Sequence, residues 1–184
     1  RSYTGQELIR LLNTHPEVEV VYLGSSTSAG KEIAEIYPHL KDSSNLALED
    51  ERVPDVDLLF MALPHGITAA RAEEILARGI KMIDLGADFR LERPESYEEW
   101  YKLKHANPQI LKQPVYGLPE LYRGDIKGKN LIANPGCYPT ASLLALVPLL
   151  QAGLIQKDNI IIDAKSGVSG AGRGMNQNVH FSEV

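Results

Sequence analysis

The sequence predicts an α/β fold in which a parallel sheet carries helices on both faces. Two observations support this class: apolar or β-branched runs alternate with helical patterns, and the connections between them are only a few residues long. The 184 residues suffice for one large domain, or for one domain and part of a second.

Two helices and one strand are expected in the first part of the chain. An apolar stripe of leucine and isoleucine predicts a helix over residues 3–13, and Pro16 ends it. The β-branched run at residues 18–23 predicts a strand. A loop of small residues follows, and a short helix is expected over residues 31–36.

The middle of the chain repeats a strand–helix pattern. Residues 56–63 form an apolar run typical of a buried strand, and residues 67–77 predict a helix that Gly79 stops. A short strand is expected at residues 82–85, and a polar surface helix at residues 94–104.

The last part of the chain is less regular. Residues 108–128 are rich in proline and glycine and predict an ordered loop. A short strand at residues 131–133 leads into an apolar helix that includes residues 141–147. Residues 159–164 predict another strand, which leads into a glycine-rich segment.

Composition excludes several classes of function. The formal charge of −5 disfavours non-specific nucleic-acid binding, which needs a basic face. The longest apolar stretch, residues 141–150, is far shorter than a membrane helix, and no signal peptide is expected. A single cysteine rules out an intrachain disulfide, which fits a reducing cytosol. No metal site is predicted.

Cys137 is the only cysteine and lies in the motif Asn-Pro-Gly-Cys-Tyr-Pro-Thr of residues 134–140. A thiol at the start of a helix meets unpaired N–H groups and the positive end of the helix dipole, which favour the nucleophilic thiolate. The same N–H groups could hold an oxyanion on a substrate carbonyl. On these residues alone, Cys137 is either a nucleophile or a small packing residue.

Two segments suggest a dinucleotide cofactor. Tyr-Thr-Gly at residues 3–5 could be the end of a glycine fingerprint before a helix, although a single glycine is more often a turn residue. Ser25 and Ser26 follow the strand expected at residues 18–23, where NAD enzymes often carry a carboxylate. Hydroxyl groups there favour the 2′-phosphate of NADP, and a solvated serine loop is the alternative.

Further candidates follow the next two strands. Pro64 and His65 stand at the carboxyl end of a buried strand, where a histidine borders a cofactor, caps the next helix or faces solvent. Buried charges must pair, so Asp88 could pair with Arg90, or Asp84 with a partner elsewhere, and the structural role is favoured for Asp84. Arg90 could instead clamp a substrate carboxylate or phosphate, and both roles remain open.

Two later segments carry charged groups in tight surroundings. Glu120, in Tyr-Gly-Leu-Pro-Glu at residues 116–120, either contacts substrate or braces its loop. The glycine-rich segment of residues 166–174 permits close approach of a ligand to the backbone, and Arg173 offers it a cation. A flexible loop is the alternative.

Taken together, these motifs resemble N-acetyl-gamma-glutamyl-phosphate reductase, a family of the aspartate-semialdehyde dehydrogenase superfamily. The resemblance spans the whole chain, and the cysteine motif followed by Ser-Gly-Ala-Gly-Arg at residues 169–173 is its most specific part. It implies a Rossmann-like doubly wound parallel sheet over residues 1–135, without its first strand. Residues 136–184 would begin a second α/β domain for catalysis and dimerisation.

The resemblance implies NADPH-dependent reduction of an acyl phosphate to an aldehyde through a thioester on the catalytic Cys137, in arginine biosynthesis. A cytoplasmic homo-oligomer, dimer or tetramer, is implied as well, or an organellar one in a eukaryote. The implied cofactor contacts are Thr4, Gly5, Ser25, Ser26, Pro64, His65, Ser169, Gly170, Ala171 and Gly172. The implied substrate contacts are Arg90, Glu120, Asn134 and Arg173.

The chain departs from the family pattern at both ends. The first strand and opening glycines of the cofactor motif are missing, as is the downstream His-Arg-His segment with the acid/base histidine. We therefore expect a fragment without activity of its own. The alternatives are reductases of carrier-bound aminoadipyl phosphate or aspartyl phosphate, a non-enzymatic NADP sensor, and a cysteine hydrolase.

Overall fold

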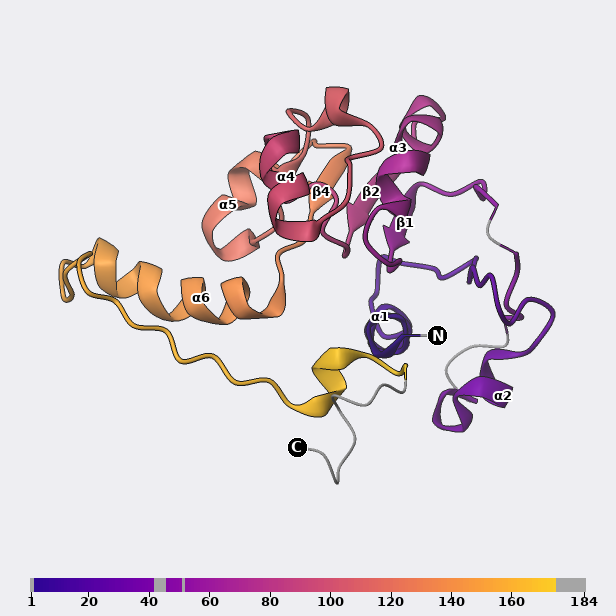
Figure 1. Cartoon of the computed structure of the whole chain (residues 1–184). Helices are drawn as coiled ribbons and strands as arrows, with labels where there is room; N and C mark the ends of the chain where they lie inside the picture. The colour runs from indigo at the N-terminus through magenta and orange to yellow at the C-terminus, as the bar shows by residue number, and fades with distance from the viewer. Residues whose placement is uncertain (1, 42–45, 51, 175–184) are drawn as a thin grey trace. The chain divides into compact units, whose positions relative to one another are not determined.

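The computed structural model describes residues 2–41, 46–50 and 52–174, and these fall into two compact units. The first unit contains the described residues up to Val56 together with residues 165–174, and the second comprises Asp57–Ala164. Each unit has its own buried residues. Figure 1 shows the helices and strands along the chain.

The second unit is built on a four-stranded parallel sheet with strand order β1-β2-β4-β3. In chain order its strands are β1 (Leu58–Met61), β2 (Lys81–Asp84), β3 (Val115–Tyr116) and β4 (Leu131–Ala133). Phe60 pairs with Ile83, and Ile83 pairs with Ile132, so the register runs straight across the three main strands. The predicted α/β class and the strands expected near residues 56–63, 82–85 and 131–133 are confirmed.

Four α-helices accompany this sheet: α3 (Ile67–Ala77), α4 (Pro94–Tyr101), α5 (Pro119–Ile126) and α6 (Cys137–Gln151). The helix α3 packs against β2, and Ala72, Ile75 and Met82 are completely buried between them and their neighbours. The helices predicted at residues 67–77, 94–104 and 141–147 are confirmed, with α4 ending at Tyr101 and α6 beginning at Cys137.

The prediction that residues 108–128 form an ordered loop is wrong. This segment contains a 3-10 turn, η2 (Pro108–Ile110), as well as β3 and α5. Proline is the first residue of both η2 and α5, where its fixed φ suits a helix start and its missing N–H costs nothing. Because proline was taken only as a residue that ends helices, the starts of η2 and α5 were not predicted.

The first unit is held by a small apolar cluster of Ile9, Ile33, Tyr37, Leu40 and Leu48. Its helical elements are α1 (Tyr3–Leu12), α2 (Ile33–Ile36), η1 (Pro38–Leu40) and η3 (Val168–Ala171). Ser2 caps α1, because its Oγ accepts a hydrogen bond of 2.9 Å from Gly5 N. The helices predicted at residues 3–13 and 31–36 are confirmed.

Two predicted strands are wrong. Residues 18–23 lead only to an isolated parallel bridge between Gly24 and Glu49, and residues 159–164 form no strand. Ile161 is 92% exposed and Ile162 is 57% exposed. A β-prone run needs a neighbouring strand to supply hydrogen bonds, and the described residues provide none at either place.

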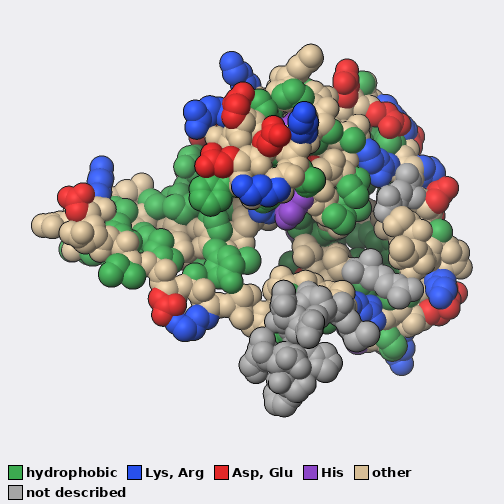
Figure 2. Space-filling view, in the orientation of Figure 1, with side chains coloured by type: hydrophobic (Ala, Val, Ile, Leu, Met, Phe, Trp, Pro, Cys, Tyr) green, Lys and Arg blue, Asp and Glu red, His purple; other side chains and the backbone are tan. Residues whose placement is uncertain are grey.

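The helix α6 is apolar on all sides. None of its residues is charged or buried, and Tyr138, Leu144 and Leu149 are among its exposed side chains. Figure 2 shows hydrophobic side chains gathered over this helix. Among the described residues, no helix is long and apolar enough to cross a membrane.

Candidate functional site

Three loops of the second unit leave the same edge of its sheet, because β1, β2 and β4 are parallel. Residues 62–66 follow β1, residues 85–90 follow β2, and residues 134–136 follow β4 and lead into α6. Of the predicted site residues, this edge brings together Pro64, His65, Arg90, Asn134 and Cys137.

Cys137 is exposed and is the first residue of α6, after the N-cap residue Gly136. The first turn of the helix closes at Thr140, whose N and Oγ1 both donate to Gly136 O, at 3.0 Å and 2.9 Å. Pro139 has no N–H, and no described residue accepts a hydrogen bond from Cys137 N or Tyr138 N. Two backbone donors are therefore open beside the thiol, which is not a buried packing residue.

Arg90 holds the loop that precedes Cys137. Its Nε donates to Asn134 O at 2.8 Å, and its Nη2 donates to Leu85 O at 2.9 Å. Two of its three nitrogens therefore bind main chain, and Nη1 makes no hydrogen bond with a described residue. The pairing of Arg90 with Asp88 is wrong, because the carboxylate of Asp88 lies among other donors.

Asp88 is completely buried and ties the loop after β2 to the start of α3. Its Oδ1 accepts hydrogen bonds from Gly66 N at 2.7 Å and from Tyr97 Oη at 2.8 Å, and its Oδ2 accepts one from Ala69 N at 2.9 Å. The carboxylate acts as a helix cap supplied from a distant loop, and the helix dipole favours its charge. A structural role for Asp88 was one of the possibilities left open by the sequence, and these partners agree with it.

His105 holds Asp88 in place through a hydrogen bond to its main-chain oxygen. Asn107 N donates to His105 Nδ1 at 3.2 Å, which places the ring proton on Nε2, and Nε2 donates to Asp88 O at 2.8 Å. The ring of His105 also meets Tyr97 and Phe89 edge to face. Tyr97 is completely buried, and burial together with its bond to Asp88 raises the pKa of its hydroxyl. Sequence reasoning missed Tyr97 and His105, since neither stands in a recognisable motif.

Asp84 ends β2 and is completely buried. Burial raises the pKa of its carboxyl from 3.8 to about 6, although the Gly86 N–H bond, the nearby Thr68 hydroxyl and the charge of Arg90 lower it. Its Oδ1 accepts from Gly86 N at 3.0 Å. Asp84 Oδ2 and Thr68 Oγ1 are both buried, and neither has a partner in good hydrogen-bond geometry among the described residues. This confirms a structural rather than a surface position for Asp84.

Gly117 and Tyr116 line the other side of β4. A Cβ at Gly117 would lie 2.7 Å from Ile132 Cγ2 and 3.2 Å from Ala133 O, so only glycine fits this contact. Burial raises the pKa of Tyr116, and the charge of Arg90 lowers it. Glu120 is exposed in the first turn of α5.

His65 and Pro64 are exposed after β1. The His65 ring lies 5.2 Å from the ring of Tyr101, measured between centroids. The α3 N–H groups of Gly66 and Ala69 are already bound by Asp88, so this helix start does not offer them to a ligand. A contact of His65 with a ligand would have to come from its exposed ring.

The other predicted site residues belong to the first unit. Thr4 and Gly5 lie in the first turn of α1, where Ser2 already binds Gly5 N. Ser25 is buried with its N–H bound to Glu49 O at 2.8 Å, whereas Ser26 is exposed.

The glycine-rich segment also belongs to this first unit. Ser169, Gly170 and Ala171 lie in η3, and Gly172 caps it. The guanidinium of Arg173 stacks on the ring of Tyr37, with 5.0 Å between Cζ and the ring centroid. The segment is therefore ordered by contacts inside its own unit, whereas Cys137 belongs to the second unit.

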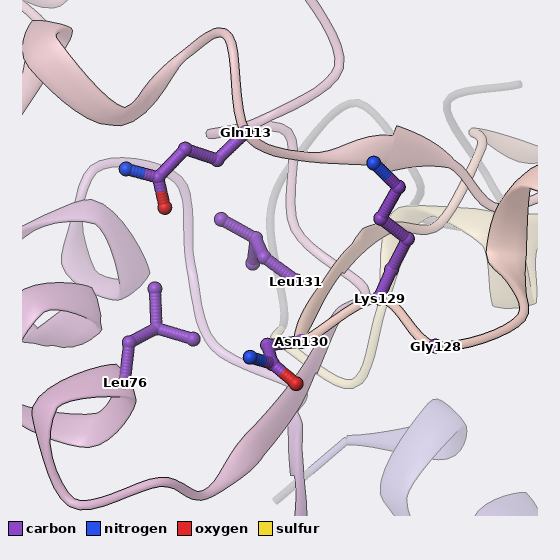
Figure 3. Close-up of a pocket in the computed structure, with 6 residues that line it drawn as sticks. All are labelled: Leu76, Gln113, Gly128, Lys129, Asn130 and Leu131. Carbon is purple, nitrogen blue, oxygen red and sulfur yellow. The ribbon is translucent and has the colours of Figure 1, made fainter.

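A surface pocket of about 370 Å³ lies at the opposite, amino end of β4. Leu76, Gln113, Gly128, Lys129, Asn130 and Leu131 line it (Figure 3). The Lys129 ammonium group and the Gln113 amide point in different directions, so the polar groups do not converge (Figure 3). None of the predicted site residues lines this pocket. Among the described residues, no group of three or more metal-binding side chains occurs.

Comparison with known proteins agrees with the motifs. The family described as semialdehyde dehydrogenase, NAD binding domain, matches residues 1–129, and the family described as semialdehyde dehydrogenase, dimerisation domain, matches residues 137–184. Among solved structures, aspartate semialdehyde dehydrogenase II of Vibrio cholerae superposes with a TM-score of 0.61 at 18% identity, over 94% of this chain and 46% of that one. This likeness shows the fold.

Curated relatives give the more specific match. N-acetyl-gamma-glutamyl-phosphate reductase of Symbiobacterium thermophilum is 54% identical over 99% of this chain and 53% of the relative. The reductase of Desulforudis audaxviator is 51% identical over 99% of this chain and 54% of the relative. The chain thus spans about half the length of the curated relatives it matches, and the resemblance inferred from its motifs is confirmed. The chain belongs to the semialdehyde dehydrogenase family.

Proposed function

We propose that the protein reduces N-acetyl-gamma-glutamyl phosphate to N-acetylglutamate semialdehyde with NADPH, as a step of arginine biosynthesis. The observation that carries this proposal is the exposure of Cys137 and its position at the start of a helix. The only cysteine is exposed at the first residue of α6, between two open backbone donors. The substrate follows from the name shared by relatives at 51–54% identity.

Cys137 is the nucleophile of the proposed reaction. Its thiolate attacks the carbonyl carbon of the acyl phosphate, the bond from that carbon to the phosphate oxygen breaks, and phosphate leaves with the electron pair. The product of this step is a thioester on Cys137. NADPH, when bound, supplies the hydride that reduces the thioester carbonyl, after which the aldehyde leaves and the thiolate returns.

The open donors at the start of α6 support both steps. Each step passes through a tetrahedral centre whose oxygen carries negative charge, and Cys137 N and Tyr138 N are free to bind it. Removal of one such donor costs about 3 kcal/mol of transition-state stabilisation in other enzymes. The chain's contribution is therefore a nucleophile and its oxyanion donors on a single helix turn.

The residues present fit an anionic cofactor with a 2′-phosphate. The loop of residues 24–30 contains no acidic side chain, and Ser26 and Thr27 are exposed on it. We propose Thr4, Gly5, Ser25, Ser26, Pro64, His65 and residues 169–172 as the cofactor contacts. Glu120, Asn134 and Arg173 are the proposed substrate contacts, whereas two nitrogens of Arg90, the fourth candidate, are already bound to main chain.

We propose a first domain over residues 1–135, a second that begins at residue 136, and a homo-oligomer in the cytoplasm. The uncharged α6 and the exposed isoleucines of residues 160–162 support association, since a helix that is apolar on all sides is typically covered. The match to a dimerisation domain from residue 137 also supports a dimer or tetramer.

Turnover of the full-length protein tests this function. NADPH oxidation should depend on the acyl phosphate, and Cys137→Ser should abolish it. In the absence of NADPH, intact-mass spectrometry should show the acyl group on the wild-type protein and release of phosphate. Equal turnover by Cys137→Ser would refute the mechanism, and turnover with aspartyl phosphate alone would refute the substrate.

A further inference from the structure

The guanidinium of Arg90 joins two loops that leave neighbouring strands of the sheet. Its Nε and Nη2 bind Asn134 O and Leu85 O, although Arg90 and Asn134 are 44 residues apart in the sequence. Both acceptors are main-chain carbonyl oxygens. The bond geometry therefore fixes the course of the backbone just before Cys137, independently of the side chains there.

The close approach of Arg90 also explains Gly136. Its φ of −70° suits any residue, so backbone conformation does not demand glycine. A Cβ at this position would lie 3.3 Å from Arg90 Nη1 and 3.8 Å from Arg90 Cζ. The guanidinium thus packs on the N-cap residue of α6, directly before the thiol.

The positive charge of Arg90 has no close counter-ion among the described residues. No carboxylate there forms an ion pair with it, and its hydrogen bonds go to neutral carbonyl groups. The titratable groups that respond to its charge are Asp84 and Tyr116, whose pKa values it lowers. A cation at this place adds to the positive end of the α6 dipole.

We propose that Arg90 is a positioning residue for Cys137, which fixes the turn of residues 134–136 and places an unpaired positive charge beside the start of α6. This inference deepens the proposed function and rests on it for its catalytic consequence. It differs from the substrate clamp expected of Arg90, because two of the three guanidinium nitrogens are bound to main chain.

Alkylation of Cys137 by iodoacetamide tests the inference without substrate or cofactor. In the 184-residue chain every adduct reports this one thiol. Arg90→Ala should slow alkylation at about pH 7 by about fivefold, the effect of a lost charge at a helix end. Arg90→Lys keeps the charge but not the two fixed bonds, and should recover only part of the rate. Arg93→Ala, which removes an exposed arginine nearby, should leave the rate unchanged.

Gly136→Ala is a second variant that keeps the arginine. Its methyl group would push on Nη1 without straining the backbone, so the chain should fold and its alkylation rate should fall. If Arg90→Ala does not fold, as judged by circular dichroism, Arg90→Lys and Gly136→Ala decide the question. Rates equal to the parent in the folded variants would overturn the inference.

Steady-state kinetics of the full-length protein separate positioning from substrate binding. A positioning role predicts that Arg90→Lys lowers kcat and leaves KM unchanged. A higher KM at unchanged kcat would overturn the inference in favour of a substrate clamp. If the parent protein shows no NADPH-dependent turnover, the proposed function fails, whereas the alkylation rates still decide the role of Arg90.

Discussion

Replacement of Asp84 by asparagine is expected to stabilise the chain above pH 6. The carboxyl of Asp84 is completely buried, and burial raises its pKa from 3.8 to about 6. Between these values the folded chain holds a proton that the unfolded chain has released. The free energy of unfolding therefore falls as pH rises through this window and stays lower above it.

The expected gain follows from the size of this difference. The change from 3.8 to about 6 corresponds to about 3 kcal/mol at full ionisation, as an upper value. The amide that replaces the carboxyl would keep an oxygen for the 3.0 Å bond from Gly86 N and would direct its NH₂ toward Thr68 Oγ1, which lacks a well-placed partner among the described residues. We expect Asp84→Asn to raise the free energy of unfolding by about 1–3 kcal/mol at about pH 8.

Urea unfolding followed by circular dichroism measures this effect. The difference between Asp84→Asn and the parent should be large at about pH 8 and small at about pH 4, where the folded parent is protonated. Asp125→Asn, on the exposed face of α5, should change stability by less than about 0.5 kcal/mol at either pH. Loss of stability in Asp84→Asn at about pH 8 would refute the reasoning, since it would mean that the fold needs the ionised carboxylate.

Three further changes have defined outcomes. Asp88→Ala leaves three donors without their acceptor and should lower the free energy of unfolding by about 3–5 kcal/mol in the same assay. Tyr97→Phe loses one of these bonds and should cost about 1–2 kcal/mol, whereas Tyr101→Phe on the same helix should cost little; equal losses would contradict the assigned bond. Gly117→Ala should cost about 1–3 kcal/mol because its Cβ would lie 2.7 Å from Ile132 Cγ2, whereas Gly124→Ala has open space, and its thermal midpoint should not fall.

Sequence patterns predicted those elements whose partners lie in the described chain. The apolar runs that became β1, β2 and β4 pair with one another, so their local signal and their surroundings agree. Residues 18–23 and 159–164 are equally rich in apolar and β-branched residues. Neither segment forms a strand, because no strand lies next to it among the described residues. A high strand propensity allows a segment to form a strand, but the strand forms only where a neighbouring strand pairs with it.

The candidate site, too, could be predicted from the sequence only in part. Cys137 at a helix start was predictable, because the motif combines a turn, a cysteine and an apolar helix-forming run. The partners of Asp88 and Arg90 were not, since Gly66 and Ala69 at the start of α3, Tyr97 in α4 and Asn134 after β4 reach them only through tertiary packing. A charged pair two residues apart suggested a salt bridge, but the buried main-chain donors and acceptors nearby were the stronger partners.

The most direct test of the account is the reactivity of Cys137 in the folded chain against that in the same chain unfolded in urea. Open N–H groups at a helix start and a neighbouring cation favour a thiolate, and the chain places those of Cys137, Tyr138 and Arg90 together only when α6 and its loop are formed. Alkylation by iodoacetamide at about pH 7 should therefore be faster in the folded chain than in the unfolded one. A slower reaction in the folded chain would contradict the assignment of Cys137 as the nucleophile.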